Sequence, residues 1–242
     1  MHRIIQHLLF STLVQLFLSP LLGITTGAFA QVIVDRAIVT LKSGGRPIEN
    51  VVVGNSGTET LYVTAHPDVM TNPGEETEKR VITEDLLVSP KRFALGGGAQ
   101  RTVRLLLKKT YGETEQVYRV KFVPEAKGFG PEDAGEIKGK RATLKVLTGM
   151  GILILVEPKA PSPSLTWTRS DSKIIFRNEG NVNIFLEEGK ACKNEGSECA
   201  NLPAGRLYPG NTLEAPTSRD RLVTYRKQTG EVFETVTIPP GK

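Results

Sequence analysis

The sequence predicts an all-β protein made of two β-sandwich domains, and three observations support this fold class. No segment shows the apolar spacing of a long amphipathic helix. Short runs rich in Val, Ile, Leu, Thr and Tyr recur instead, separated by Gly, Pro and Asn, as is typical of strands joined by turns. About 210 residues remain once an N-terminal export signal is set aside, which suits two domains of roughly 100 residues each.

The predicted export signal covers residues 1–30. Arg3 precedes an apolar run over residues 8–22, and Ala28-Phe29-Ala30 then has the form of a cleavage site. We therefore expect cleavage between Ala30 and Gln31 and no stable membrane insertion afterwards. The alternative, a membrane anchor, needs about 20 apolar residues. It is disfavoured because polar residues and a proline interrupt the run: Gln15, Ser19 and Pro20.

The first domain is expected to span residues 31–158 and to contain seven strands. These cover residues 32–41, 48–55, 61–67, 87–89, 100–108, 116–123 and 142–156. Residues 69–80 include Asn72-Pro73-Gly74 and are predicted to form a hairpin or loop tip. Residues 125–140 form a long polar connection, and loops of that length are usually functional or mobile.

The last of these strands is the most informative segment of the chain. Residues 142–156 read ATLKVLTGMGILILV, and the even positions are apolar along almost the whole length. Alternation places those even side chains on one face of the strand. A strand so apolar must either be buried or, at a sheet edge, act as a template for pairing with another chain.

The second domain is expected to span residues 159–242. A stiff stretch, Lys-Ala-Pro-Ser-Pro-Ser over residues 159–164, marks the boundary. Seven further strands are predicted, over residues 164–168, 173–177, 181–187, 206–208, 212–215, 222–226 and 232–238.

The only two cysteines, Cys192 and Cys199, are seven positions apart. A close pair in an exported chain is most simply one disulfide that holds a hairpin together. A metal site would need more ligands, and His66 is the only histidine after the export signal.

Composition disfavours nucleic-acid binding and catalysis. The net charge is +5, but Lys and Arg are scattered and aromatic residues are few. One histidine after the signal leaves no Ser/His/Asp arrangement. Gly96-Gly97-Gly98 lacks the Gly-Lys-Ser/Thr of a phosphate-binding loop and is better explained as a turn. We expect no enzyme activity and no cofactor.

Three arginines in or beside apolar strands leave two interpretations open. Arg36, Arg104 and Arg119 can extend their charged ends to solvent along apolar stems. Alternatively, a guanidinium in such a place can grip a carboxylate with two hydrogen bonds.

Several segments together resemble the periplasmic chaperones of the chaperone–usher pilus pathway. In the first domain these are VDRAIV (34–39), SPKRFAL (89–95) followed by QRTVRL (100–105), and EQVYRV (115–120). In the second domain they are FRNEGN (176–181) and LYPG (207–210). The strand that ends in Val156-Glu157-Pro158 lies where the donor strand of this family ends in a proline. Ala142-Thr143, GILILV (151–156) and the cysteine pair resemble the alternate branch, such as the chaperones of the enterobacterial common pilus.

The resemblance implies two immunoglobulin-like sandwiches in an L-shaped arrangement and a function in pilus assembly. Such a chaperone lends one of its own strands to a pilus subunit that lacks its last strand, and delivers the subunit to the outer-membrane usher. Pilus subunits and the usher are therefore the expected partners, and the periplasm the expected location. The lent face would comprise Leu144, Val146, Thr148 and Met150. The alternative is an exported two-domain structural component of a pilus, or an adhesin.

The resemblance also implies a pair of basic residues that anchor the C-terminal carboxylate of the pilus subunit. Arg36 matches the first. The second falls on Leu153 or Gly151, neither of which is basic, so Lys145, Arg104 and Arg119 are the candidates for its role.

An ion pair between the domains is also part of the resemblance. Glu115 matches its acid, but Glu157 occupies the place of the base.

Overall fold

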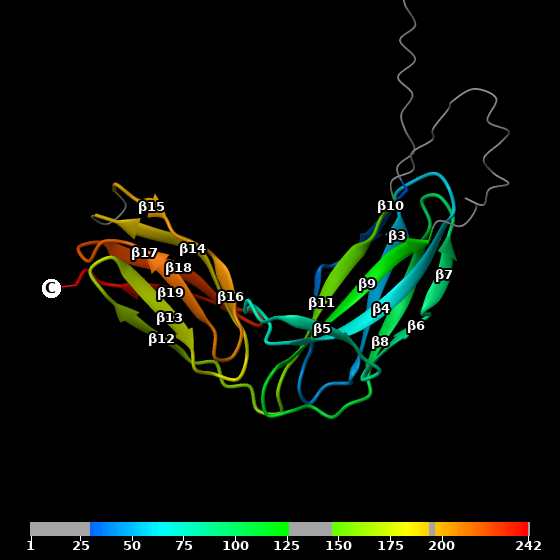
Figure 1. The fold of residues 1–242 in the computed structure, drawn as a ribbon, viewed down its shortest axis with the longest axis horizontal. Helices are drawn as coiled ribbons and strands as arrows, with labels where there is room; N and C mark the ends of the chain where they lie inside the picture. Colours follow the sequence, from blue (N-terminus) through cyan, green and yellow to red (C-terminus); the bar gives the residue numbers. More distant parts are fainter. Residues whose placement is uncertain (1–29, 126–146, 194–196, 242) are drawn as a thin grey trace, which may run out of the picture.

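The computed structural model describes residues 30–125, 147–193 and 197–241, and its strands form two β-sandwiches (Figure 1). The described residues contain no helix. The two sandwiches meet at one end, at an angle, so that the molecule is L-shaped (Figure 1). The all-β, two-sandwich prediction is thus confirmed. The export signal lies outside the described residues, except for Ala30.

The first sandwich has one sheet in the strand order β10-β1-β3-β8-β6. Its strands are β1 (Ala30–Val34), β3 (Ile48–Asn55), β6 (Leu86–Ser89), β8 (Gln100–Leu107) and β10 (Leu147–Thr148). Its second sheet has the order β2-β11-β9-β4-β5, with β7 beside β4. These strands are β2 (Ile38–Leu41), β4 (Leu61–Thr71), β5 (Lys79–Ile82), β7 (Arg92–Leu95), β9 (Gln116–Glu125) and β11 (Met150–Val156).

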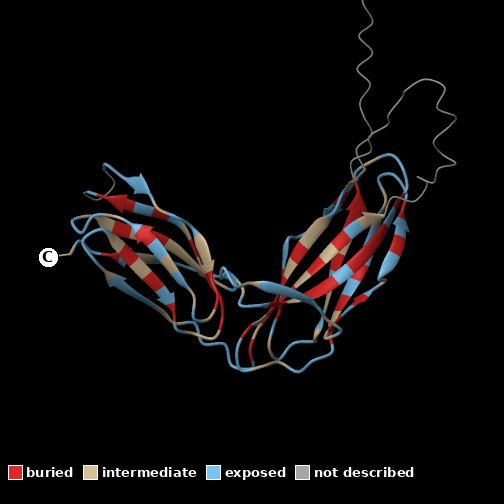
Figure 2. Ribbon diagram, in the orientation of Figure 1, coloured by how far each residue is buried: buried red, intermediate tan, exposed pale blue. Residues whose placement is uncertain are grey.

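Apolar side chains from both sheets of the first sandwich pack between them. Val120 and Phe122 of β9 and Ile152 and Ile154 of β11 are all fully buried. Buried and exposed residues alternate along many of the strands (Figure 2), as expected when one face of a sheet covers a core and the other does not.

Two predicted long strands are each divided between the two sheets, which corrects the sequence interpretation. The segment predicted over residues 32–41 ends as β1 and resumes as β2, with Asp35 at the corner. Asp35 accepts a hydrogen bond from the amide of Val52 at 2.9 Å, and its own amide donates to the carbonyl of Val52 at 3.0 Å. These two bonds pin the corner against β3.

The segment predicted over residues 142–156 is divided at Gly149 into β10 and β11. β10 pairs in parallel with β1, and β11 pairs in parallel with β2. A Cβ atom on Gly149 would lie 2.7 Å from the carbonyl oxygen of Phe122, so glycine permits the close approach at this crossing. Residues 142–146 lie outside the described residues.

The division at Gly149 also changes which side chains face the core. Leu147 and Met150 are partly buried and pack against the first core, whereas Thr148 is exposed. Beyond the division, Ile152, Ile154 and Val156 point inward, as the alternation predicted. The described residues therefore do not place all the even positions on one continuous face.

The predicted hairpin over residues 69–80 is formed by β4 and β5, which pair antiparallel. Its tip reaches the second domain, where the Asn211 side-chain amide donates to the carbonyl of Pro73 at 2.8 Å. Gly74 next to it has a φ of +77°, a conformation that favours glycine.

The second sandwich has one sheet in the order β12-β13-β17 and another in the order β15-β14-β18-β19, with β16 beside β14. Its strands are β12 (Leu165–Arg169), β13 (Lys173–Asn178), β14 (Ile184–Cys192), β15 (Ala200–Asn201), β16 (Gly205–Leu207), β17 (Thr212–Pro216), β18 (Leu222–Thr229) and β19 (Val232–Ile238). In its core the rings of Phe176 and Tyr225 pack edge to face, with their centroids 5.0 Å apart.

The predicted disulfide is confirmed: Cys192 at the end of β14 is bonded to Cys199. Arg221 supports the same end of the domain by donating to the carbonyls of Ala191 and Glu198. β14 begins three residues later than the predicted strand and continues to the disulfide, and the short β15 was not predicted.

We expect Gly149→Ala to lower the free energy of unfolding by about 1–3 kcal/mol, because the added methyl group would overlap a backbone carbonyl that cannot easily move. Urea unfolding followed by circular dichroism measures the change. Gly96→Ala is the matched control, since a Cβ atom there meets nothing within 4 Å. Equal losses in both variants would contradict the role given to Gly149.

Candidate functional site

The outer face of the sheet β2-β11-β9-β4-β5 forms one wall of the cleft between the domains. Where the sheet meets the second domain, Leu155, Val117 and Met70 are cross-strand neighbours and pack together with Tyr208. The next row outward on this face contains Leu153, Arg119 and Asp68. The wall therefore changes from apolar at the junction to charged one row further out.

Arg119 lies at the centre of this wall. A Cβ atom on Gly151 would come within 3.0 Å of the Arg119 Nε, so the missing side chain makes room for the guanidinium over β11. Among the described residues, no hydrogen bond or ion pair engages Arg119. Burial raises the pKa of Tyr208, and the positive charges of Arg206 and Arg119 oppose that shift. The guanidinium is thus near the junction and uncompensated.

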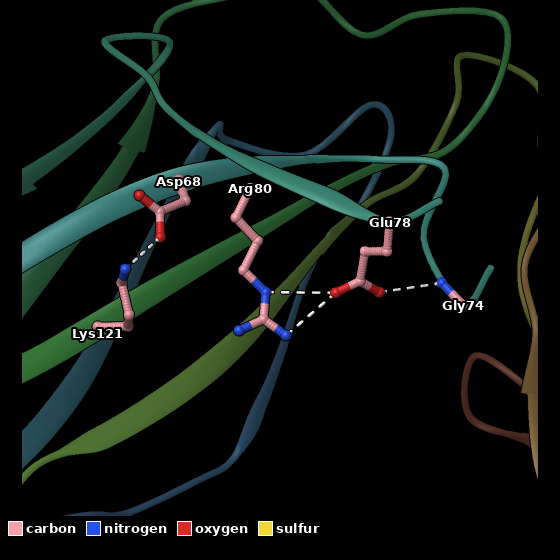
Figure 3. Close-up of polar contacts among 5 residues, drawn as sticks. All are labelled: Asp68, Gly74, Glu78, Arg80 and Lys121. Atoms are coloured by element: carbon pink, nitrogen blue, oxygen red, sulfur yellow. Dashed lines mark hydrogen bonds and ion pairs between the residues drawn. The ribbon is translucent and has the colours of Figure 1, made fainter. Parts of the chain in front are cut away.

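The absence of a partner for Arg119 has a local cause. Asp68 is its direct cross-strand neighbour, but the nearly buried carboxylate of Asp68 pairs with Lys121 at 2.7 Å (Figure 3). Glu78 in turn is held by Arg80 at 3.1 Å and by the amide of Gly74 (Figure 3). Asp68 and Glu78 are therefore already engaged. Arg119 is left without a carboxylate partner among the described residues.

The other basic candidates lie outside the strands of this wall. Arg36 is exposed at the corner between β1 and β2 and pairs with Asp35 at 3.0 Å. Arg104 is exposed on β8, opposite Asn50 and Ser89, in the other sheet. Lys145 lies outside the described residues. Of the candidates that the structure describes, Arg119 lies within the strands of the cleft wall. Arg36 borders the wall, because the amide of Leu153 donates to the carbonyl of the adjacent residue Ala37 at 2.8 Å.

The described part of the candidate donor segment, residues 147–150, begins at a sheet edge. β10 is the outermost strand of its sheet, because its only described strand partner is β1. Thr148 on β10 is exposed and Met150 on β11 is partly buried. Leu144 and Val146 lie outside the described residues, so the face they would present stays a prediction.

A polar contact crosses the domain junction, and the sequence identified only one of its members. Glu115 Oε2 accepts a hydrogen bond from the Asn183 side-chain amide at 2.6 Å and from the Asn183 backbone amide at 3.3 Å. Arg206 donates to the side-chain oxygen of Asn183. No signal in the sequence indicated Asn183 or Arg206, because they come from the second domain and only the fold brings them to Glu115.

Burial of Glu115 raises the pKa of its carboxyl group, and the donors of Asn183 and the charge of Arg206 reduce the shift. Glu157, in the place where the resemblance implied a base, adds a further increase. Its Oε2 accepts a hydrogen bond from the amide of Ser43 at 3.3 Å. The implied ion pair between Glu115 and position 157 is thus replaced by hydrogen bonds to Asn183.

The described residues contain no group of three or more His, Cys, Asp and Glu side chains that is placed to hold a metal ion. Across the same residues, no helix has the length and apolar character needed to cross a membrane.

The comparisons with known proteins identify the fold. No protein-family model and no curated protein matches the chain. Among solved structures, it is similar to the class 5 fimbriae chaperone CfaA, with a TM-score of 0.61, 22% identity, and coverage of 86% of this chain and 97% of that one. A chain of the chaperone–tip adhesin complex of CFA/I fimbriae biogenesis matches with a TM-score of 0.57, 23% identity, and coverage of 87% and 99%.

A third similar structure is that of the Salmonella enterica SafA pilin in complex with the SafB chaperone. It matches with a TM-score of 0.59, 13% identity, and coverage of 86% of this chain and 95% of that one. The chain therefore has the two-domain β-sandwich fold of the fimbrial chaperones.

We expect Glu115→Gln to change how stability depends on pH. A raised pKa means that the folded protein holds this proton more tightly than the unfolded chain does. Wild-type stability should therefore fall as the pH rises from about 4.5 through the raised pKa, and the variant should lack this decrease. Urea unfolding at a series of pH values between about 4 and 8 measures the free energy of unfolding as a function of pH.

Glu113→Gln is the matched control, because Glu113 is exposed and its one ion pair within the described residues is with Lys159. Parallel pH curves for wild type and Glu115→Gln would show that the carboxyl group has no raised pKa in the folded state.

Proposed function

We propose that this protein is a periplasmic chaperone that binds and stabilises pilus subunits by donor-strand complementation and delivers them to the outer-membrane usher. The observation that carries the proposal is the division of one apolar segment between a buried anchor, β11, and an open edge strand, β10. An edge strand offers unpaired backbone groups to another chain. Its anchor keeps the segment attached while it does so.

The physical basis is strand addition. An incoming sandwich that lacks its last strand gains backbone hydrogen bonds from the lent strand, and alternate side chains fill its open core. Each fully buried apolar side chain contributes about 1.5–3 kcal/mol. The lent face would be Leu144, Val146, Thr148 and Met150. The first three precede the anchor β11 in the sequence, and Met150 is its first residue.

Arg119 is the group that we propose as the anchor for the C-terminal carboxylate of the pilus subunit. It is on the cleft wall, its guanidinium has room over Gly151, and its cross-strand acid Asp68 is engaged by Lys121. A guanidinium can hold a carboxylate with two parallel hydrogen bonds.

The proposal also includes the processing of the chain. Residues 1–30 would be removed as a signal peptide and the mature protein would begin at Gln31. The first domain would extend to Pro158 and the second from Lys159 to the end. The chaperone would act by binding alone, without catalysis or a cofactor.

The lent strand can be tested with the double substitution Leu144→Glu, Val146→Glu. Two carboxylates cannot enter the apolar groove of a pilin without a large desolvation cost, so capture of the pilin should be lost while the chaperone still folds. The measurement is co-expression with a pilin, followed by purification and mass spectrometry of the complex. Thermal unfolding of the free variant provides the folding control. A normal yield of complex would rule out the lent strand.

The carboxylate anchor can be tested with Arg119→Gln. We expect affinity for a pilin with an intact C-terminus to fall about tenfold or more, because a charge-assisted contact is lost. Truncating the C-terminus of the pilin should remove the difference between variant and wild type. Arg104→Gln, on the other sheet, should have no effect. If Arg36→Gln weakens binding and Arg119→Gln does not, the anchor is Arg36 instead.

A further inference from the structure

A cavity of about 560 Å³ lies at the junction of the two domains, on the β2 side of the cleft wall. Strands β2 and β11 line it from the first domain, through Ile38 and Leu155 among others. The turn between β18 and β19 lines it from the second domain, together with Val232, the first residue of β19. Its volume is within the range of small-molecule binding pockets.

The charges that line this junction cavity do not balance. Two cations are present, and both are engaged: Lys42 pairs with Glu231 at 2.8 Å, and Arg206 donates to Asn183 and lies over the ring of Phe185. Two further carboxylates, Glu115 and Glu157, line the same cavity. Within the described chain, neither of these two forms an ion pair.

Buried oxygens without partners point to the same place. Glu115 is only 9% exposed, and no donor among the described residues reaches its Oε1. The Oγ1 of Thr229, which also lines the cavity, is buried and likewise lacks a partner within the described part of the chain. A buried carboxylate oxygen without a donor is costly, and a positive charge in the cavity would offset that cost through its field.

Exposed apolar side chains stand beside the acids. Ile38 is 43% exposed and Val232 is 60% exposed, and they come from opposite domains. A cavity with acidic groups and apolar flanks suits the side chain of an arginine or lysine whose neighbours in the chain are apolar. A small inorganic cation would leave the apolar flanks uncovered.

We propose that the junction cavity is a docking site for a basic side chain, arginine or lysine, presented by an extended segment of a partner polypeptide. The cation would contact Glu157, whose only described hydrogen-bond donor is the Ser43 amide at 3.3 Å, and Glu115 would strengthen the attraction from beneath. Ile38 and Val232 would cover the apolar neighbours of the basic residue. This site is independent of the pilin-binding function proposed above.

The test is a titration of the mature two-domain protein with the blocked peptide acetyl-Leu-Arg-Leu-amide, followed by amide NMR shifts. The control peptide carries citrulline, which has the shape of arginine without its charge. We expect saturable shifts at Ser43 and Gly230, and affinity for the citrulline peptide to be at least about tenfold lower. Equal affinity for the two peptides would overturn the proposal.

Variants locate the binding site. Glu157→Gln should reduce affinity for the arginine peptide to that of the citrulline peptide, whereas Glu234→Gln, on an exposed acid paired with Lys227, should leave it unchanged. Unchanged binding by Glu157→Gln would overturn the assignment. If Glu157→Gln fails to fold in a thermal unfolding control, the comparison of the two peptides on the wild-type protein still decides whether the cavity binds a basic side chain.

The kind of occupant is decided by a third ligand, arginine amide. A polypeptide site predicts that the tripeptide binds at least about tenfold more tightly than arginine amide, because the apolar flanks contribute. Equal affinities would mean that the cavity takes a free small cation, and would contradict docking of a polypeptide.

Discussion

The parallel pairing of β2 with β11 is the constraint on which the rest of the first domain depends. β2 follows β1 in the sequence and β11 follows β10, and β1 and β10 belong to the opposite sheet. β1 pairs in parallel with β10, and β2 pairs in parallel with β11. The two chain segments therefore cross from one sheet to the other side by side. The crossing is possible because Gly149 approaches the backbone of Phe122 closely. It leaves β10 at the edge of its sheet among the described strands and places β11 between β2 and β9, where Ile152 and Ile154 are fully buried.

The same arrangement positions the second domain. β11 leads directly into the connection at residues 157–164, and its outward side chains Leu153 and Leu155 face the junction. Several contacts then hold the junction. They include the apolar contact around Tyr208 and the hydrogen bonds of Glu115 with Asn183. They also include the ion pair of Lys42 with Glu231 and the hydrogen bond from Asn211 to Pro73.

The sequence was sufficient for the features that depend on local pattern. The alternation of apolar residues located most strands, Asn72-Pro73-Gly74 located the hairpin, and two cysteines in an exported chain indicated the disulfide. It was insufficient where backbones approach each other. Nothing in the run from 142 to 156 shows that Gly149 ends one strand and starts another, because the reason is the carbonyl of Phe122, distant in sequence.

The candidate site shows the same limit. Arg119 was one of several arginines that the sequence could not separate, because each had an apolar neighbourhood. What distinguishes Arg119 is pairing: Asp68 is engaged by Lys121, and Gly151 leaves space. Both facts depend on the register of β4, β9 and β11. Asn183 and Arg206 carried no signal at all, since a polar residue buried at a domain junction looks like a surface residue in the sequence.

The two unbalanced charges of the cleft have opposite signs and lie on different sides of β11. Arg119 lies on β9, one neighbour of β11, whereas the acidic junction cavity is lined by β2, the other neighbour, with Ile38 in register with Leu153. The field across the cleft wall is therefore directional. A carboxylate is attracted to the β9 side and a basic side chain to the β2 side, so a ligand with both groups would bind in only one orientation. Such polarity would set the direction of any segment that carries both groups.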